Sequence, residues 1–307
     1  MDLGLSADSR IPLGKSGLAV APLGWGMWRF AGADRGSARR LVETALEIGC
    51  TLFDTADIYG YSKGTGFGDA ESLLGEVLRE APQLRERMVL ATKAGIRPPA
   101  PYNSSARYLL DACDGSLGRL GVERIDLFQI HRPDLLAHPA EVAEALERLR
   151  RAGKIRAAGV SNHTAAQVEA LCAYLPFDLA AVQNEFSPLA IEPLSDGTMD
   201  QAMGRGVAVL AWSPLAQGRL SASPAESADD TRVAAVTAAL DAVAARAGTR
   251  RSAVACAWIM AHPAKPIPLI GSQNPARILE ARGAYSVQLT REEWYRILVA
   301  SRGSRLP

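Results

Sequence analysis

The sequence lacks an excess of charge of either sign, because 34 Lys and Arg residues stand against 33 Asp and Glu residues. Its densest basic clusters are short runs of arginine at 148–151 and 250–251. A binding groove for nucleic acid needs a basic surplus on one face, so we expect no nucleic-acid partner. No stretch reaches the ~18 continuous apolar residues of a membrane helix. Residues 1–14 lack the apolar segment of a secretory signal peptide. We therefore expect a cytoplasmic protein that does not bind a membrane.

The sequence has only four cysteines, Cys50, Cys113, Cys172 and Cys256. They are far apart, with no Cys-x-x-Cys pair and no Cys/His spacing of a zinc site. We interpret them as small buried hydrophobic residues in a reducing compartment, and we expect no bound metal. The apolar fraction of 48% and the charged fraction of 22% are ordinary for a globular protein.

Short apolar runs alternate with longer amphipathic segments along the chain. Residues 11–13 and 18–21 flank a Gly-Lys-Ser-Gly turn, which predicts a β-hairpin. Strands are predicted at 22–25, 51–54, 88–93, 125–131, 155–161, 179–184, 207–212 and 267–270. Helical patterns follow them within 31–49 and at 71–79, 105–120, 142–153, 165–174, 199–205, 233–243 and 275–284. Segments 251–262 and 291–301 predict extra helices towards the C-terminus.

Each predicted helix serves as the crossover between two strands, which favours parallel pairing. Eight such units in about 300 residues predict a single (β/α)8 TIM barrel over residues 1–307, with the N-terminal hairpin and the extra C-terminal helices added. A doubly wound dinucleotide-binding sheet is the alternative fold. It needs the pattern Gly-x-Gly-x-x-Gly after the first strand, but Arg29 occupies the third glycine position after Gly24 and Gly26.

In a barrel of this kind, functional residues lie where strands end and loops begin. Four polar residues there are Asp54, Tyr59, Lys93 and His131. Each alone has an ordinary structural explanation, but together they form a set suited to proton transfer. A lysine cation favours phenolate, so we expect Lys93 to draw the pKa of Tyr59 from about 10 towards neutrality. The imidazole can donate a hydrogen bond to a carbonyl oxygen.

The same residues carry a resemblance to a known family. The matching segments are 53–60 (FDTADIYG), 92–93 (TK), 129–134 (QIHRPD), 159–163 (GVSNH), 183–187 (QNEFS), 212–215 (WSPL) and 267–272 (IPLIGS). In this order they resemble the aldo-keto reductase superfamily over about residues 15–285. Segment 289–294 (LTREEW) resembles a bacterial branch of predicted oxidoreductases.

The resemblance implies metal-free, NADPH-linked reduction of a small carbonyl compound to an alcohol. Tyr59 would act as the general acid on the carbonyl oxygen, and Lys93 and Asp54 would tune it. His131 would orient the substrate, and hydride would come from C4 of the nicotinamide. Two alternatives remain open: a non-catalytic NADP(H)-binding regulatory or redox-sensing protein, and an alcohol or sugar dehydrogenase working in the oxidative direction.

The resemblance also implies the cofactor contacts. Ser161, Asn162 and Gln183 would bind the carboxamide, and Trp212 would stack on the nicotinamide ring. The remaining contacts would be Ser213, Leu215 and Gly218 near the pyrophosphate, Gly271, Ser272 and Arg277 near the 2′-phosphate, and Glu280 at the adenine. Arg277 favours NADPH over NADH, because arginine recognises phosphate with two parallel hydrogen bonds. Two residues depart from the family pattern, because Gly271 replaces a common lysine and Ala281 replaces an adenine-binding asparagine.

The sequence says less about the substrate. Trp28, Phe30, Tyr102 and Phe186 are candidates for an apolar substrate pocket. The identity of the carbonyl compound and the physiological direction stay open at this point.

Overall fold

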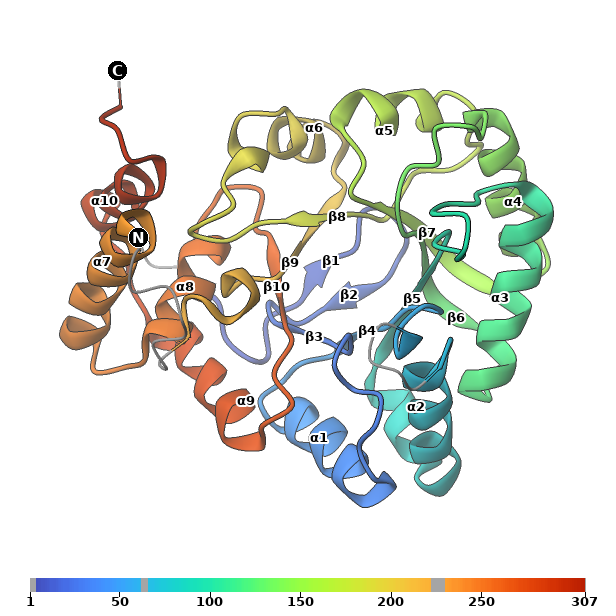
Figure 1. The fold of residues 1–307 in the computed structure, drawn as a ribbon, viewed down its shortest axis with the longest axis horizontal. Coiled ribbons are helices and arrows are strands. Elements are labelled where there is room, and N and C mark those ends of the chain that lie inside the picture. The colour runs from blue at the N-terminus through green and yellow to red at the C-terminus, as the bar shows by residue number, and fades with distance from the viewer. Residues whose placement is uncertain (1–3, 62–65, 222–229, 307) are drawn as a thin grey trace.

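The computed structural model describes residues 4–61, 66–221 and 230–306. Eight parallel strands close into a barrel in the order β10-β3-β4-β5-β6-β7-β8-β9, and helices surround it (Figure 1). The strands are β3 (Gly24–Gly26), β4 (Leu52–Asp54), β5 (Val89–Ala94), β6 (Ile125–Ile130), β7 (Ile155–Ser161), β8 (Ala181–Glu185), β9 (Ala208–Trp212) and β10 (Ile267–Ile270). The predicted (β/α)8 barrel is confirmed.

Helices alternate with these strands, and two of them lie between β9 and β10. The helices are α1 (Arg35–Glu47), α2 (Asp69–Glu80), α3 (Ala106–Leu120), α4 (Pro139–Arg151), α5 (Ala165–Cys172), α6 (Thr198–Arg205), α7 (Thr231–Ala247), α8 (Arg251–Met260), α9 (Pro275–Ala281) and α10 (Arg291–Arg302). Helices α7 and α10 pack against each other outside the ring of helices, whereas α8 packs on β10 and α9 (Figure 1). The expectation that segment 251–262 is an extra helix is therefore wrong, because α8 is the crossover helix before β10 and α7 is the extra one. Among the described helices, none is long and apolar enough to cross a membrane.

Helix α9 ends earlier than the sequence predicts. The pattern at 275–284 predicts a single helix, but α9 ends at Ala281 and a 3-10 segment, Arg282–Ser286, follows it. Gly283 lies at the break, and glycine is a poor helix former. Its α-carbon also approaches the Thr249 hydroxyl closely, since a β-carbon there would lie 2.7 Å from that oxygen. A larger residue at position 283 would require the side chain of Thr249, two residues before α8, to move.

Local capping explains where several helices begin and end. Thr164 and Gln167 form a reciprocal capping box at the start of α5, and Thr290 and Glu293 form another at the start of α10. Helix α3 ends at Gly121, whose φ of +65° is the left-handed conformation that glycine adopts freely. These signals lie in the sequence itself.

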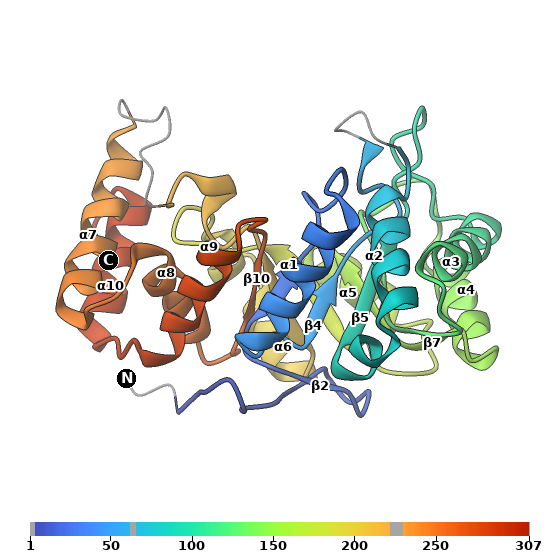
Figure 2. The same ribbon diagram turned by 90° about the horizontal axis from the view of Figure 1, so that it is seen from below.

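The hairpin of β1 (Ile11–Pro12) and β2 (Ala19–Val20) covers the N-terminal end of the barrel (Figure 2). Its buried side chains Leu13, Leu18 and Val20 join a cluster with inward-facing residues of the strands, among them Leu52 and Leu127. This end is filled by apolar packing. The buried polar residues Asp54, Lys93 and Gln183 lie at or near the opposite ends of their strands.

Strand β5 shows how alternation positions the site. Successive side chains of a strand point to opposite faces. Thr92 faces outwards and donates a hydrogen bond to the buried Glu71 carboxylate of α2, which also binds Arg119 of α3. Lys93 therefore faces into the barrel. The outward contacts anchor β5 to two helices and fix the direction of the lysine.

Candidate active site

Lys93 and Asp54 form a buried ion pair inside the barrel. The Lys93 ammonium lies 2.5 Å from Asp54 Oδ2 and donates a second hydrogen bond to the Thr55 carbonyl at 2.8 Å. Their side chains are only 1% and 3% exposed. The ammonium is 5.1 Å from the centre of the Tyr59 ring, which in turn lies 5.8 Å from the His131 ring. The structure thus brings together the four residues that the sequence singles out for proton transfer.

The segment that carries Tyr59 is tied to its surroundings by backbone hydrogen bonds. Thr55 and Asp57 donate to the carbonyls of Ala91 and Lys93 in β5. The Tyr59 carbonyl accepts from the amide of Ala70 in α2, at 3.2 Å. Tyr59 keeps part of its surface exposed, unlike Lys93 and Asp54. Its backbone is therefore fixed while part of the residue stays accessible to solvent.

Gln129 is a site residue that the sequence reasoning did not single out. Its Nε2 donates to Asp54 Oδ1 at 3.0 Å, and Gln183 Nε2 donates to the same oxygen at 3.0 Å. A signal was available, because Gln129 precedes His131 by two residues on the strand predicted at 125–131. The two side chains therefore share the inward face, where a polar residue is unusual.

The environment of Tyr59 raises its pKa above the ordinary value. Burial is the main cause, and the Asp54 carboxylate adds to it, while the Lys93 cation opposes both. Lys93 lowers the pKa of Tyr59 as expected, but burial and Asp54 outweigh it, so the net pKa is raised rather than drawn towards neutrality. The sequence places Lys93 near Tyr59 but does not reveal the cost of a phenolate withdrawn from water. At neutral pH Tyr59 carries its proton.

His131 and Lys93 are shifted in opposite directions. Burial, followed by the Lys93 and Arg132 charges, holds the pKa of His131 well below its ordinary value, so the imidazole is neutral. Its Nδ1 is buried without a hydrogen-bond partner in the described part of the chain. Burial lowers the pKa of Lys93, but Asp54 and Tyr59 outweigh it and the net pKa is raised. The lysine is therefore a permanent cation.

One of the predicted carboxamide and ring contacts, Asn162, lies next to His131 and is hydrogen-bonded to two others, Ser161 and Trp212. Asn162 adopts a left-handed conformation with φ +60° at the end of β7. Its Nδ2 donates to the His131 carbonyl at 3.1 Å and to Ser161 Oγ at 2.9 Å, and its Oδ1 accepts from Trp212 Nε1 at 3.1 Å. Ser161 pairs in register with Gln183 of β8. Asn162 thus joins the histidine to the half-buried indole of Trp212.

The loop after β9 has an unusual backbone. Ser213, Ala216 and Gln217 all have positive φ, at +56°, +48° and +59°. Ser213 Oγ accepts a hydrogen bond from the Gln217 amide at 2.8 Å, which stabilises this turn. Left-handed conformations of residues with side chains are strained and gather at functional sites. The strain falls in the loop where Leu215 and Gly218 are predicted to approach a pyrophosphate.

The predicted 2′-phosphate loop is anchored beside the barrel. The Trp25 indole donates to the Ser272 carbonyl at 3.1 Å, and a β-carbon at Gly271 would meet nothing within 4 Å. Arg277 is exposed and makes no ion pair with another described residue. Glu280 instead lies 4.0 Å from Arg250. The side-chain amide of Gln273 has both its polar atoms buried without a partner among the described residues.

The residues expected to line a substrate pocket fall into two groups. Trp28 and Tyr102 are 48% and 39% exposed. Phe30 is fully buried with its ring edge-on to Trp25 at 5.5 Å, and Phe186 is fully buried against Trp258. The two phenylalanines belong to the hydrophobic core. Only Trp28 and Tyr102 have the surface to contact a substrate.

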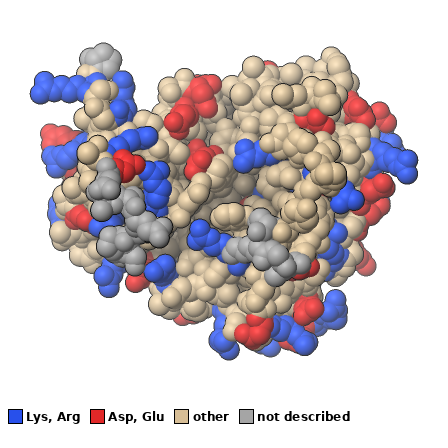
Figure 3. All heavy atoms as spheres, in the orientation of Figure 1, with Lys and Arg blue, Asp and Glu red and all other residues tan. Residues whose placement is uncertain are grey.

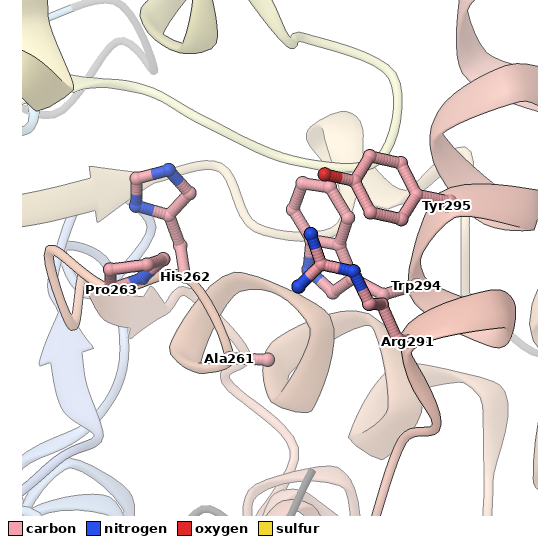
Figure 4. A pocket seen from close by; sticks show the side chains of 6 residues that line it. All are labelled: Ala261, His262, Pro263, Arg291, Trp294 and Tyr295. Atoms are coloured by element: carbon pink, nitrogen blue, oxygen red, sulfur yellow. The ribbon is translucent and has the colours of Figure 1, made fainter.

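The face shown in Figure 3 is hollowed near its centre, with both signs of charge around the hollow. A separate surface pocket of about 260 Å³ lies between the end of α8 and the start of α10 (Figure 4). Its lining residues are Ala261, His262, Pro263, Arg291, Trp294 and Tyr295. Residues 261–263 precede β10, so this pocket lies towards the N-terminal ends of the strands. Within the described ranges, no cluster of three or more His, Cys, Asp or Glu is placed to hold a metal.

A family model described as "Aldo/keto reductase family" matches residues 22–300. The chain belongs to the aldo/keto reductase family. It is 54% identical over 297 residues to a 6-dehydroglucose reductase of Novosphingobium aromaticivorans, covering 96% of each protein. It is 33% identical to a 6-dehydroglucose reductase of Agrobacterium fabrum, over 94% of this chain and 97% of that one.

Among solved structures, the thermostable aldo-keto reductase Tm1743 superimposes with a TM-score of 0.81 over 95% of this chain and 99% of that one. At 23% identity this likeness concerns the fold. Family membership confirms the predicted resemblance, and it makes the protein an oxidoreductase that acts on carbonyl or alcohol groups. Aldo/keto reductases use NAD(P)H, so a nicotinamide cofactor belongs to this enzyme class.

Proposed function

We propose that this aldo/keto reductase uses NADPH to reduce the C6 aldehyde of a glucose-like sugar to a primary alcohol. The main support is the buried Lys93–Asp54 pair beside Tyr59 and His131, which forms an apparatus for protonating a carbonyl oxygen. The substrate class is supported by the relatives from Novosphingobium and Agrobacterium, both named 6-dehydroglucose reductases.

The residues of the chain fit a phosphorylated nicotinamide dinucleotide. Trp212 offers a partly exposed ring whose indole N–H is held by Asn162. The left-handed turn at 213–217 lies in the loop predicted to approach the pyrophosphate, and the exposed Arg277 is a cation without an ion pair among the described residues. When bound, the cofactor supplies the hydride that reduces the carbonyl carbon. Ser161, Asn162, Gln183 and Trp212 would hold the nicotinamide, and Ser272 and Arg277 would hold the 2′-phosphate.

The chain's own residues carry the proton. Tyr59 is protonated at neutral pH, which is the form that donates a proton to the carbonyl oxygen. The Lys93 cation stabilises the phenolate that remains, and Asp54 keeps Lys93 charged. Neutral His131 donates a hydrogen bond to the same carbonyl oxygen and orients it. One hydride on carbon and one proton on oxygen complete the alcohol.

Replacing Tyr59 by phenylalanine tests this function. We expect Tyr59→Phe to reduce carbonyl reduction by about 10²–10⁴-fold, the usual contribution of a general acid, and to leave NADPH affinity unchanged. Tyr61→Phe is a matched control, because Tyr61 loses the same hydroxyl two residues away at an exposed position. If Tyr59→Phe and the wild type turn over NADPH equally fast, Tyr59 is not the acid.

The substrate and the direction need a separate comparison. A hexose with an aldehyde at C6 should have a higher kcat/KM than a simple aliphatic aldehyde of similar reactivity. Rates of carbonyl reduction and alcohol oxidation, measured at cellular cofactor ratios, distinguish a reductase from the alternative of a sugar or alcohol dehydrogenase.

The choice of NADPH rests on Arg277 and is tested by binding. We expect Arg277→Ala to weaken NADPH about tenfold, the loss of ~1.4 kcal/mol, and to leave NADH nearly unchanged. Arg282→Ala is the control, because Arg282 is also exposed and lies just after α9. Equal weakening of both cofactors by Arg277→Ala would contradict the assignment.

A further inference from the structure

The two carboxylate oxygens of Asp54 have different partners. Oδ2 accepts from the Lys93 ammonium at 2.5 Å. Oδ1 accepts from Gln129 Nε2 and from Gln183 Nε2, each at 3.0 Å. The ion pair with Lys93 thus uses one oxygen, while two neutral amides from β6 and β8 hold the other.

The two glutamines also bind each other. Gln183 Nε2 lies 3.3 Å from Gln129 Oε1, so Gln129 accepts from Gln183 and donates to Asp54. This chain of contacts fixes the amide orientation of both residues. The nitrogen of Gln183 is committed to Asp54 and Gln129, which leaves its Oε1 as the atom free to contact another group.

Gln129 occupies a position that packing alone would give to an apolar residue. It is fully buried, and Leu127 occupies the preceding inward-facing position on β6. A buried amide is unfavourable unless its hydrogen bonds are made, and a hydrophobic residue of similar volume avoids that requirement. The contacts of Gln129 therefore point to a role beyond filling the barrel.

We propose that Gln129 is a positioning residue, which aims the Asp54 carboxylate at Lys93 and turns the Gln183 oxygen towards the nicotinamide carboxamide. This inference rests on the proposed reductase function. Gln129 acts through Asp54 and Gln183, and it couples the group that tunes Tyr59 to a group that holds the cofactor.

The coupling has an electrostatic consequence at Tyr59. The charged and titratable groups around this ring are Asp54, Lys93, His131 and Arg132. The Asp54 charge raises the pKa of Tyr59. A donor hydrogen bond from Gln129 offsets part of that charge, so its removal should raise the pKa of Tyr59 further. Alcohol oxidation, which needs the phenolate, should then require a higher pH.

Gln129→Met removes the amide and nearly keeps the length of the side chain. We expect kcat for carbonyl reduction to fall about tenfold, which corresponds to ~1.4 kcal/mol, while KM for the carbonyl changes less than about twofold. The pH at half-maximal alcohol oxidation should move upwards. Leu127→Met is the matched control for packing on the same face of the same strand, and it should change neither quantity.

Cofactor binding provides a readout that needs no turnover. A fluorescence titration with NADPH should show weaker binding by about threefold in Gln129→Met, or ~0.65 kcal/mol. Gln183→Met should weaken binding more, and the double variant should bind no more weakly than Gln183→Met alone, because both changes act on one contact. Circular dichroism verifies that each variant is folded.

The outcomes separate the two proposals. Additive effects of Gln129→Met and Gln183→Met on NADPH binding, or an unmoved pH profile with kcat intact, would overturn the positioning role. So would an equal loss of kcat in Leu127→Met, which would assign the effect to packing. If the wild type reduces no carbonyl compound, the proposed function fails, and the NADPH titration alone still decides the role of Gln129.

Discussion

The Lys93 ammonium lies 2.5 Å from Asp54 Oδ2, and both side chains are withdrawn from solvent. Removing one partner of such a pair leaves an uncompensated buried charge, which is more harmful than removing both. The proximity therefore has consequences for stability as well as for chemistry.

Asp54→Asn should lower the free energy of unfolding by about 3–5 kcal/mol, because it leaves the Lys93 cation buried without a counter-charge. Urea denaturation at neutral pH measures this change. The double variant Asp54→Asn/Lys93→Met should recover much of the loss. A double variant less stable than Asp54→Asn would show that the ion pair does not dominate the local energetics.

The neutral state of His131 predicts the acid side of the pH profile. Its pKa lies well below 6.5 because of burial and the nearby Lys93 and Arg132 charges. Carbonyl reduction should therefore not decline with a midpoint near 6.5 as the pH falls from about 8 to 6. The measurement is kcat/KM against pH. A decline with that midpoint that disappears in His131→Asn would contradict a neutral imidazole.

Asp57 predicts a pH dependence of stability. Burial, followed by the Glu71 charge, raises its pKa from 3.8 to about 8, against an opposing hydrogen bond from Tyr108. Between these values the unfolded chain has lost the proton and the folded chain keeps it, so stability falls as the pH rises.

Asp57→Asn keeps an acceptor for Tyr108 and removes the titration. This substitution should raise the melting temperature at pH 8 by several degrees. A stability gain of 1 kcal/mol raises the melting temperature by about 2–4 °C in proteins somewhat smaller than this one. Near pH 4 the two proteins should melt at nearly the same temperature. An equal difference at both pH values would mean that the effect of Asn is unrelated to ionisation.

Alanine substitutions at two helical glycines should have opposite effects on the stability of the protein. A β-carbon at Gly75 of α2 would lie 2.1 Å from the Arg119 carbonyl oxygen of α3, so Gly75→Ala should destabilise the protein by about 1–3 kcal/mol or more. Gly118 of α3 has no atom within 4 Å of its β-carbon position, so Gly118→Ala should stabilise the protein by up to ~1 kcal/mol. Denaturation curves of both variants test whether close packing of α2 on α3 is responsible.

The barrel could be predicted from the sequence because its signals are local and repeated. Strand and helix periodicities alternate, and the parallel topology then places the ends of the strands together. That rule is enough to bring Asp54, Lys93 and His131 into one neighbourhood before any coordinates are known. The periodicity at 275–284 does not reveal the break after Ala281, nor that Gly283 lies against Thr249, which is distant in sequence.

The energetics of the site could not be predicted in the same way. The direction of the Tyr59 shift depends on how much water surrounds its hydroxyl, which residue types and spacing do not reveal. Phe30 shows the same limit, because an aromatic residue after the first strand can face a pocket or the core. Its edge-on contact with Trp25 is a property of the folded chain.

The N-terminal hairpin determines the end of the barrel from which the site can be reached. Because Leu13 and Leu18 close one end of the barrel with apolar side chains, we expect reactants to reach the site from the opposite end, where Tyr59 keeps part of its surface exposed. In the proposed reaction, the sugar, the cofactor and the proton that reprotonates Tyr59 would all enter from that end. The side on which the reactants enter is in this sense set by packing at the far end of the molecule.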